Sequence, residues 1–208
     1  MVRIHSYVVD HDIGFAPNPY HGYCTLATCK QEIRRVAEVD DWVIGTGAAK
    51  NRRAGYLVYA MRIEEALTFD DYWRDSRFGR KRPDLSGSRK VRFGDNIYHC
   101  ETGVWVQENS RHSRADGTPE PIHIERDTKS DRVLISSDFV YFGKDGPPVP
   151  SELRTRYPMD LVSLRGHRNR FPAEQVAEAE AWLRTLPRGV VGKPFDWHRK
   201  ENLARTRR

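Results

Sequence analysis

A cysteine, a histidine and an aspartate near the start of the chain have the residue types of a thiol active site. Cys24 follows His21 by three residues, in a loop that precedes a helical pattern, and Asp10 ends the first apolar run. A nearby helix N-terminus lowers the pKa of a thiol, and a histidine or an aspartate can accept its proton. The sequence therefore offers Cys24, His21 and Asp10 as candidates for nucleophilic catalysis.

The same loop also has the composition of a binding pocket for a base. Residues 14–30 read GFAPNPYHGYCTLATCK, and the two prolines make this loop rigid. Aromatic rings stack on an extruded base, amide and hydroxyl groups bind its edge, and glycines let the backbone approach it. Together with the run DWVIGTG, the loop supplies the candidates Phe15, Asn18, Tyr20, Tyr23, Thr25, Trp42, Gly45, Thr46 and Gly47. The alternative interpretation is that Phe15 and Trp42 belong to the hydrophobic core.

The positive charge of the chain is concentrated in two segments. The net charge is +6, yet residues 74–92 carry eight basic and two acidic groups, and residues 188–208 carry seven and two. Such segments supply salt-dependent affinity for phosphates, and Arg80, Lys81 and Arg82 are the phosphate-binding candidates. We therefore predict a nucleotide or a nucleic acid, in particular DNA, as the partner. Solvated or disordered segments are the alternative.

A zinc site is the third chemistry that the residue types permit, but the spacing of its ligands is poor. Cys24 and Cys29 lie five residues apart, His21 precedes them, and His99 and Cys100 form a distant dipeptide. Zinc-binding cysteines usually lie two to four residues apart and occur in two pairs. We therefore predict no metal and no cofactor, and we expect Cys29 and Cys100 to be small buried apolar residues.

The composition of the chain narrows the class of protein. Its 208 residues, 38% hydrophobic and 11% aromatic, suffice for one domain with a core that depends on rings. The chain has no long apolar run, no signal-peptide pattern and an odd number of cysteines, so we expect a cytoplasmic protein without a membrane partner. The run GTGAAK lacks the spacing of a phosphate-binding glycine loop, which disfavours nucleotide hydrolysis.

More strands than helices are predicted around these residues. Strands are predicted over residues 4–10, 41–47, 55–67, 97–107, 133–136 and 139–142, and helices over 29–39, from 68 onward and over 173–186. This order does not alternate regularly, so we predict an α+β domain with a curved or barrel-like mixed sheet, a few short helices and a C-terminal helix. Residues 1–187 would form this single domain, and residues 188–208 a basic tail.

Four blocks of the sequence resemble one family of proteins. They read SYVVDHDIGFAPNPYHGYCTLATCK, DDWVIGTG, FDDYWRDSRF and SSDFVYFG. Together they resemble the nucleotide modification associated domain 2 family over roughly residues 1–165. That family occurs in bacteria and phages, and its genomic associations link it to the modification of nucleic-acid bases. The opening of the chain also resembles PUA-like domains of the EVE and YTH kind, in which an aromatic pocket accepts a base.

The resemblance implies a role in DNA modification without assigning a reaction. We therefore predict a domain that binds a nucleotide or a modified base in an aromatic pocket. An enzyme that makes or edits a modified base or its precursor, through Cys24, His21 and Asp10, is the alternative. A protein whose basic tail binds an acidic partner is a third class.

Overall fold

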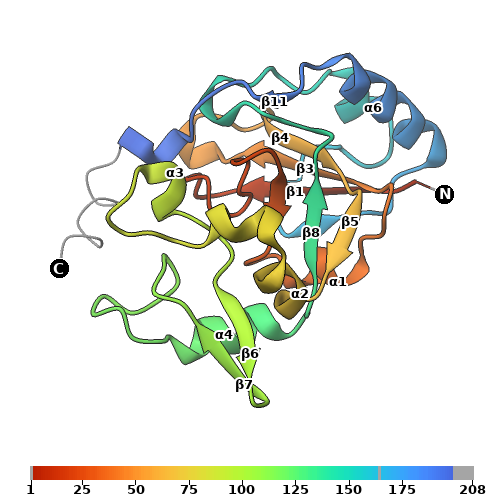
Figure 1. Cartoon of the computed structure of the whole chain (residues 1–208). Helices are drawn as coiled ribbons and strands as arrows, with labels where there is room; N and C mark the ends of the chain where they lie inside the picture. Colours follow the sequence, from red (N-terminus) through yellow and green to blue (C-terminus); the bar gives the residue numbers. More distant parts are fainter. Residues whose placement is uncertain (1, 164, 199–208) are drawn as a thin grey trace. The chain divides into compact units, whose positions relative to one another are not determined.

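The chain forms two compact units, each assembled from separate segments of the sequence. A computed structural model describes residues 2–163 and 165–198, and Figure 1 shows the path of the chain. Unit 1 contains the described residues within 1–12, 37–64 and 136–195, and unit 2 contains those within 13–36, 65–135 and 196–208. Because the chain enters each unit more than once, neither unit is complete until distant segments have been brought together.

Unit 1 is organised around an open six-stranded sheet. Its strands lie in the order β10 (His167–Arg168), β1 (Ile4–Val9), β3 (Trp42–Gly47), β4 (Leu57–Arg62), β9 (Phe139–Tyr141) and β11 (Gly189–Val190). The pairs β1–β3 and β9–β11 are parallel, whereas the other neighbours are antiparallel. Within the described residues the sheet does not close, since β10 and β11 form its edges.

The core of unit 1 combines this sheet with the longest helix. The helix α6 (Ala173–Thr185) contributes Val176, Ala179 and Leu183, whose spacing of three and four residues places them on one helix face. They belong to the same buried cluster as Trp42 and Ile44, which alternate along β3. Three short helices complete unit 1, namely η1 (Ala49–Asn51), η3 (Gly143–Asp145) and α5 (Glu152–Thr155).

Unit 2 contains two small sheets and several short helices. One sheet has the order β2 (Cys24–Leu26), β8 (Val133–Ser136) and β5 (Glu65–Leu67), and the other is the hairpin of β6 (Tyr98–Glu101) and β7 (Val104–Gln107). The helices are α1 (Gln31–Val36), α2 (Phe69–Arg74), η2 (Ser76–Lys81), α3 (Arg89–Arg92) and α4 (Pro121–Thr128). Rings dominate the core, which contains Phe15, Phe69, Tyr72, Phe78, Phe93 and Tyr98. Aromatic side chains thus replace the long aliphatic helix faces that these short elements do not provide.

The expected α+β class is confirmed, but several details differ from the prediction. The strand expected over residues 97–107 is the hairpin of β6 and β7, and the helix expected over residues 29–39 is limited to Gln31–Val36. The sheet of unit 1 is open, so the barrel-like closure is not found, and PUA-like curvature stays a prediction. The strand expected over residues 55–67 is divided into β4 and β5, because the chain passes there from unit 1 to unit 2. Part of the expected tail is ordered, since β11 pairs with β9 and η4 covers Phe195–His198; residues 199–208 lie outside the described part.

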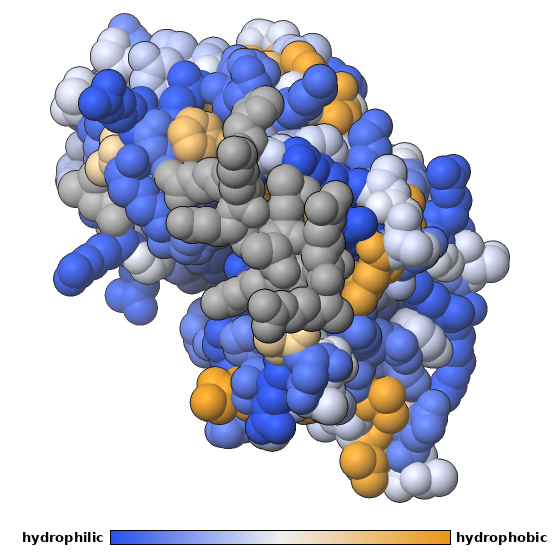
Figure 2. Space-filling model, turned by 90° about the vertical axis from the view of Figure 1, so that its left-hand side faces the viewer, coloured by the Kyte–Doolittle hydropathy of each residue, from blue (hydrophilic) through white to orange (hydrophobic). Residues whose placement is uncertain are grey.

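The helices of the described residues are short, and the apolar side chains on the face seen in Figure 2 are scattered. Among the described residues, no helix is long and apolar enough to cross a membrane. On the face seen in Figure 2, hydrophobic side chains form small separate patches between hydrophilic ones. Scattered apolar residues of this kind are usual on protein surfaces. This face therefore gives no sign of a large apolar interface.

Candidate active site

Three side chains of unit 2 form a chain of contacts from a thiol to a carboxylate. The Sγ atom of Cys29 lies 3.6 Å from Nε2 of His112, and Nδ1 of His112 lies 2.8 Å from Oδ2 of Asp127. A nucleophile, an imidazole and a carboxylate occur in this order in catalytic triads, where the imidazole accepts the proton of the nucleophile. We call Cys29, His112 and Asp127 the thiol relay.

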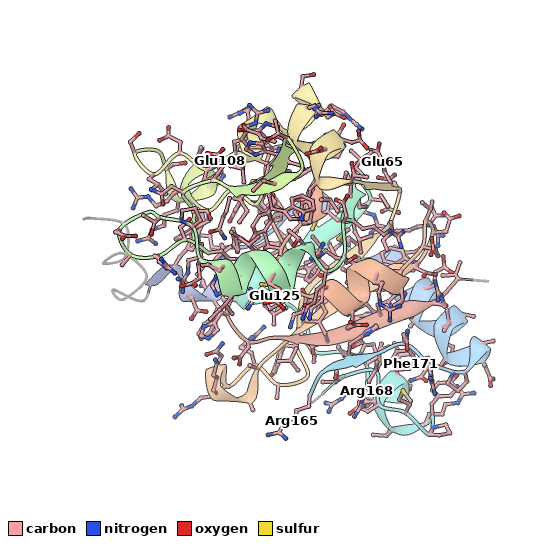
Figure 3. All side chains as sticks on the ribbon, turned by 90° about the horizontal axis from the view of Figure 1, so that it is seen from below. Glu65, Glu108, Glu125, Arg165, Arg168 and Phe171 are labelled. Carbon is pink, nitrogen blue, oxygen red and sulfur yellow. The ribbon has the colours of Figure 1, made fainter. Side chains whose placement is uncertain are left out.

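The three members of the thiol relay come from separate segments of unit 2. Cys29 lies just before α1 with a left-handed φ of 56°, His112 follows β7, and Asp127 lies near the end of α4. Figure 3 labels Glu125 on α4, whose side chain is exposed, whereas Asp127 two residues later is buried. Positions two apart on a helix lie on different faces, so α4 directs Asp127 inward. Asp127 also accepts the N–H of Cys29 at 3.0 Å, which fixes the backbone beside the thiol.

A buried arginine holds the segments of Cys29 and Asp127 together. The side chain of Arg34 is 0% exposed. It donates to the carbonyl oxygens of Cys29 at 2.9 Å, Asp127 at 2.5 Å, Ser130 at 2.6 Å and Arg132 at 2.7 Å. Burial lowers the pKa of Arg34 to about 10, so the guanidinium stays charged at neutral pH. Its planar fork of donors therefore fixes the geometry of the relay through the backbone.

Electrostatics determine the protonation states of the relay. Burial alone raises the pKa of Asp127, but the hydrogen bond from His112 and the charges of His112 and Arg126 outweigh it and hold that pKa at about 2. Burial lowers the pKa of His112 below 6.5 and raises the pKa of the Cys29 thiol. At neutral pH the relay thus contains a carboxylate, a neutral imidazole and a protonated thiol. Because the carboxylate accepts the proton on Nδ1, the lone pair of His112 lies on Nε2 and faces Sγ.

Neighbouring side chains fix the orientation of the imidazole and the carboxylate. The hydroxyl of Tyr98 donates to Oδ2 of Asp127 at 3.0 Å, and Nδ1 of His123 donates to the carbonyl oxygen of His112 at 2.8 Å. Phe15 packs edge-on against the ring of His112, with 4.8 Å between centroids and 70° between planes. Such supporting contacts keep catalytic groups in a productive geometry.

The thiol relay also contains the residue types of a metal centre. One ligand atom from each of Cys29, His112 and Asp127 lies within 4.8 Å of the others. The hydrogen bond from Nδ1 to Asp127, however, makes the carboxylate an outer partner of the imidazole. In this arrangement only Sγ and Nε2 face a shared ligand, whereas zinc sites use three or four protein ligands. The geometry therefore fits proton transfer better than metal binding.

The predicted catalytic residues do not form the same arrangement. Cys24 is 0% exposed in β2, and burial raises the pKa of its thiol. Within the described residues, Nε2 of His21 is buried without a hydrogen-bond partner. Asp10 belongs to unit 1, where its carboxylate lies 2.7 Å from Nζ of Lys50.

A buried polar network surrounds Cys24 instead. Nζ of Lys81 donates to Oδ1 of Asn18 at 2.9 Å and to Oγ1 of Thr25 at 3.0 Å. Thr25 and Tyr72 donate in turn to the carboxylate of Asp95, at 2.6 and 2.9 Å. All five side chains are 0% exposed. We call Asn18, Thr25, Tyr72, Lys81 and Asp95 the lysine network.

The lysine network corrects one expectation about phosphate binding. Lys81 was expected to face phosphates, but it is fully buried, and burial lowers its pKa to about 8. Its ammonium group is turned inward because carbonyl and side-chain oxygens of the loop need a donor there. Arg80 and Arg82 are exposed, and the guanidinium of Arg82 lies 3.8 Å from the ring centroid of Trp73. Of the three phosphate-binding candidates, Arg80 and Arg82 are therefore exposed and Lys81 is not.

Most of the residues proposed for a base pocket lie inside the two units. Those in unit 2 are Phe15, Asn18, Tyr20, Thr25 and the half-buried Tyr23, and those in unit 1 are Trp42, Gly45, Thr46 and Gly47. Phe15 and Trp42 belong to the hydrophobic clusters of unit 2 and unit 1, which matches their alternative interpretation as core residues. A Cβ at Gly45 would approach Tyr59 to 2.4 Å, and one at Gly47 would approach Arg53 to 2.5 Å. The lack of space for a Cβ therefore explains why both positions hold glycine, without recourse to a ligand.

Sequence reasoning missed His112 and Asp127. Both lie in the segment 108–129, which looked polar and rich in turns and in which no helix was expected. Its helix α4 begins at Pro121, a favoured residue at the first helical position. Pro121 was therefore the residue from which the start of this helix could have been predicted. Nothing in the spacing of the three relay residues, however, indicates that they meet.

The comparisons with known proteins agree with the resemblance seen in the sequence. No curated protein and no solved structure matches the chain. Residues 1–201 match the family described as nucleotide modification associated domain 2. The match includes the helix α6, which the resemblance over residues 1–165 had left out. The chain therefore belongs to the nucleotide modification associated domain 2 family.

Proposed function

We propose that the protein is an enzyme of nucleotide modification that uses Cys29 as a nucleophile. The observation that carries this proposal is the thiol relay, in which His112 lies between a thiol and an ionised carboxylate. The family gives the setting, which is nucleotide modification. This takes up the alternative that the sequence left open, an enzyme with a Cys/His/Asp site, in place of the predicted binding domain, and assigns the site to different residues.

In the proposed reaction, Cys29 forms a transient covalent bond with the substrate. Nε2 of His112 accepts the thiol proton while Sγ attacks an electrophilic carbon of the base or of the group transferred to it. The electron pair displaced from that carbon moves to its oxygen or ring nitrogen. When this pair returns, the bond from the carbon to the leaving atom breaks, and His112 gives its proton to that atom. An acceptor then attacks the same carbon and loses its proton to His112, and the carbon–sulfur bond breaks as Sγ takes this proton back. Asp127 stabilises the imidazolium without itself taking a proton.

The protonation states support general-base catalysis. A thiol with a raised pKa is a weak nucleophile at neutral pH unless a base removes its proton during attack. A histidine with a lowered pKa is neutral under the same conditions and can serve as that base. Cys29 is also partly exposed, whereas Cys24 is buried. Of these two cysteines, Cys29 is therefore the one that combines partial exposure with a histidine able to accept its proton.

Binding of a nucleotide or of DNA is part of the same proposal. Arg80 and Arg82 supply exposed positive charge for phosphates. Replacing both arginines by serine weakens binding to all nucleic acids and lowers the salt slope by up to about two phosphate equivalents. Titrations with a labelled oligonucleotide at several salt concentrations measure both quantities.

The decisive experiment is mass spectrometry of nucleosides from DNA and from the nucleotide pool. Cells that express the wild-type protein are compared with cells that express Cys29→Ser, with Cys24→Ser as the matched control. We expect a changed nucleoside in the wild type and in the control, and none in Cys29→Ser. A change that survives Cys29→Ser would refute the nucleophile. No change in any strain would leave a binding protein as the better description.

A metal at the relay is the competing function, and its test is separate. Elemental analysis of the purified protein measures bound zinc in the wild type and in His112→Asn. One equivalent of zinc that disappears in the variant would replace the nucleophile by a metal centre. Turnover that persists in a chelator, in protein without metal, supports the thiol.

A further inference from the structure

A cavity in unit 1 is not used by the proposed function. It has a volume of about 220 Å³, and the described residues that line it all belong to unit 1. Two residues singled out in the sequence, Asp10 and Gly47, lie on its wall. The thiol relay belongs to unit 2, so this cavity needs an explanation of its own.

The cavity lies at the carboxyl ends of two parallel strands. Val8 of β1 is paired with Thr46 of β3, and Asp10 and the run Ala48–Lys50 follow directly after these strands. The lining includes Val8, Asp10 and Ala48–Lys50. In sheets with parallel strands, ligands usually bind outside the carboxyl ends of the strands. The cavity therefore has the position of a ligand site.

Opposite charges lie side by side at this cavity. Oδ2 of Asp10 is 2.7 Å from Nζ of Lys50, with 60% and 42% of the two side chains exposed. An ion pair this exposed contributes little to stability, so a ligand can replace either partner at low cost. Ser163, also on the wall, donates its hydroxyl proton to the carbonyl oxygen of Arg165 at 2.9 Å. Ser163 is 0% exposed, so its hydroxyl is committed to the backbone and not to a ligand. Figure 3 labels Arg165 near this segment.

The remaining wall is aliphatic and small. It consists of Val8, Ala48, Ala49, Ala54, Val162 and the backbone of Gly47. No aromatic ring is among the described residues that line the cavity, whereas base pockets rely on stacking. The volume is below the roughly 300 Å³ at which pockets for larger ligands begin. Size and lining thus favour a small ligand with a short aliphatic part.

We propose that this cavity binds a small zwitterion, a free α-amino acid with a short aliphatic side chain. Its ammonium group donates to Asp10, its carboxylate accepts from Lys50, and its side chain packs against Val8 and Ala54. Both charges of the ligand then replace the weak contact between Asp10 and Lys50. This inference goes beyond the proposed function and does not depend on Cys29.

Isothermal titration calorimetry of the full-length protein tests the proposal. Glycine, alanine, serine and valine are titrated beside propionate and ethylamine, which each lack one of the two charges. We expect at least one amino acid to bind, and each analogue to bind about tenfold more weakly or less, the factor that one charged hydrogen bond provides. The same loss is expected in Asp10→Asn and in Lys50→Gln.

Two further variants control for charge and for space. Glu180→Gln removes a partner of another ion pair, with Arg184 on α6, and leaves binding unchanged. Ala54→Leu places a larger side chain at an exposed position of the wall and abolishes binding, while the thermal midpoint shows that the protein is folded.

Three results would overturn the proposal, and a fourth separates it from the proposed function. The first is the absence of any heat of binding for every amino acid at about 10 mM. The second is binding that Asp10→Asn does not weaken, and the third is displacement of the amino acid by a deoxynucleoside monophosphate. Cys29→Ser retains full amino-acid affinity, so failure of the nucleophile leaves this proposal intact, and the reverse also holds.

Discussion

Cys24 and Cys29 are five residues apart and belong to the same unit, yet their surroundings differ in kind. The thiol of Cys24 is fully buried beside the lysine network, whose charged members are Lys81 and Asp95. Cys29 is only half-buried as a residue, and its thiol lies 3.6 Å from a neutral imidazole. Burial raises the pKa of both thiols. A nearby charge therefore does not distinguish a nucleophile from a core residue, whereas access and a base within reach do.

The difference between the thiol relay and the lysine network is tested most directly by removing one carboxylate from each. Asp127→Asn favours the wrong tautomer of His112, because an amide can donate to Nδ1, and turnover falls on the order of 10³-fold. Asp95→Asn is the matched change in the lysine network and leaves turnover per folded molecule unchanged. Steady-state rates corrected for the folded fraction measure both effects. Equal losses in the two variants would contradict the assignment of the relay.

The lysine network is expected to control stability rather than turnover. Lys81→Met leaves the carboxylate of Asp95 buried without its cation and leaves several acceptors without a donor. Breaking a buried charge pair on one side typically costs about 3–5 kcal/mol of unfolding free energy. Arg80→Met changes the adjacent exposed residue and shifts that free energy by at most about 0.5 kcal/mol. Urea denaturation measures both, and similar values would show that Lys81 is not a structural residue.

Alkylation of the native protein measures the difference in reagent access between the thiols of Cys24 and Cys29. Iodoacetamide at pH 8 is expected to modify Cys29 at least about tenfold faster than Cys24, because Cys24 reacts only after local opening. In urea the two rates become similar. Peptide mass spectrometry after timed quenching gives the rates, and faster labelling of Cys24 in the folded protein would reverse the comparison.

The smallest expected effect is the pH dependence of the relay. The pKa of His112 is lowered below 6.5, so the unfolded chain binds a proton first, and stability declines as the pH falls from about 6.5. One such group contributes a slope of at most about 1.4 kcal/mol per pH unit. Asp127 affects stability at lower pH. The stabilisation that it contributes is complete above about pH 4 and is lost as the pH falls toward its pKa of about 2. His112→Asn should remove the upper slope in denaturation curves recorded between these values. It should also weaken the lower one, because the imidazole that holds down the pKa of Asp127 is then gone.

Local signals explain how much of the fold could be predicted. The cap of α2 is confirmed, since Thr68 accepts the N–H of Asp71 at 3.0 Å, and so is the long helix α6 that follows Pro172. Both depend on residues that are close in sequence. The division of residues 55–67 between two sheets was not predictable, because it depends on where each half finds its partner strands.

The site was harder to predict than the fold, for a related physical reason. Loop 14–30 was expected to hold the functional side chains, and one of its cysteines, Cys29, does contact an imidazole. Its partners His112 and Asp127 follow 83 and 98 residues later, so no sequence spacing indicates that they meet. The burial of Lys81 was equally hidden, because a lysine between two exposed arginines has the pattern of a solvated surface.

The four carbonyl contacts of Arg34 have a consequence for the time at which the thiol becomes reactive. Three of the four carbonyl groups belong to residues 93 to 98 positions further along the chain. A ribosome synthesises the chain from its N-terminus, so Cys29 is made long before the segment that fixes it. The thiol therefore passes through synthesis without its base and its carboxylate. Under the proposed function, the thiol can therefore react by this mechanism only after residues 127–132 have been made and have folded against Arg34.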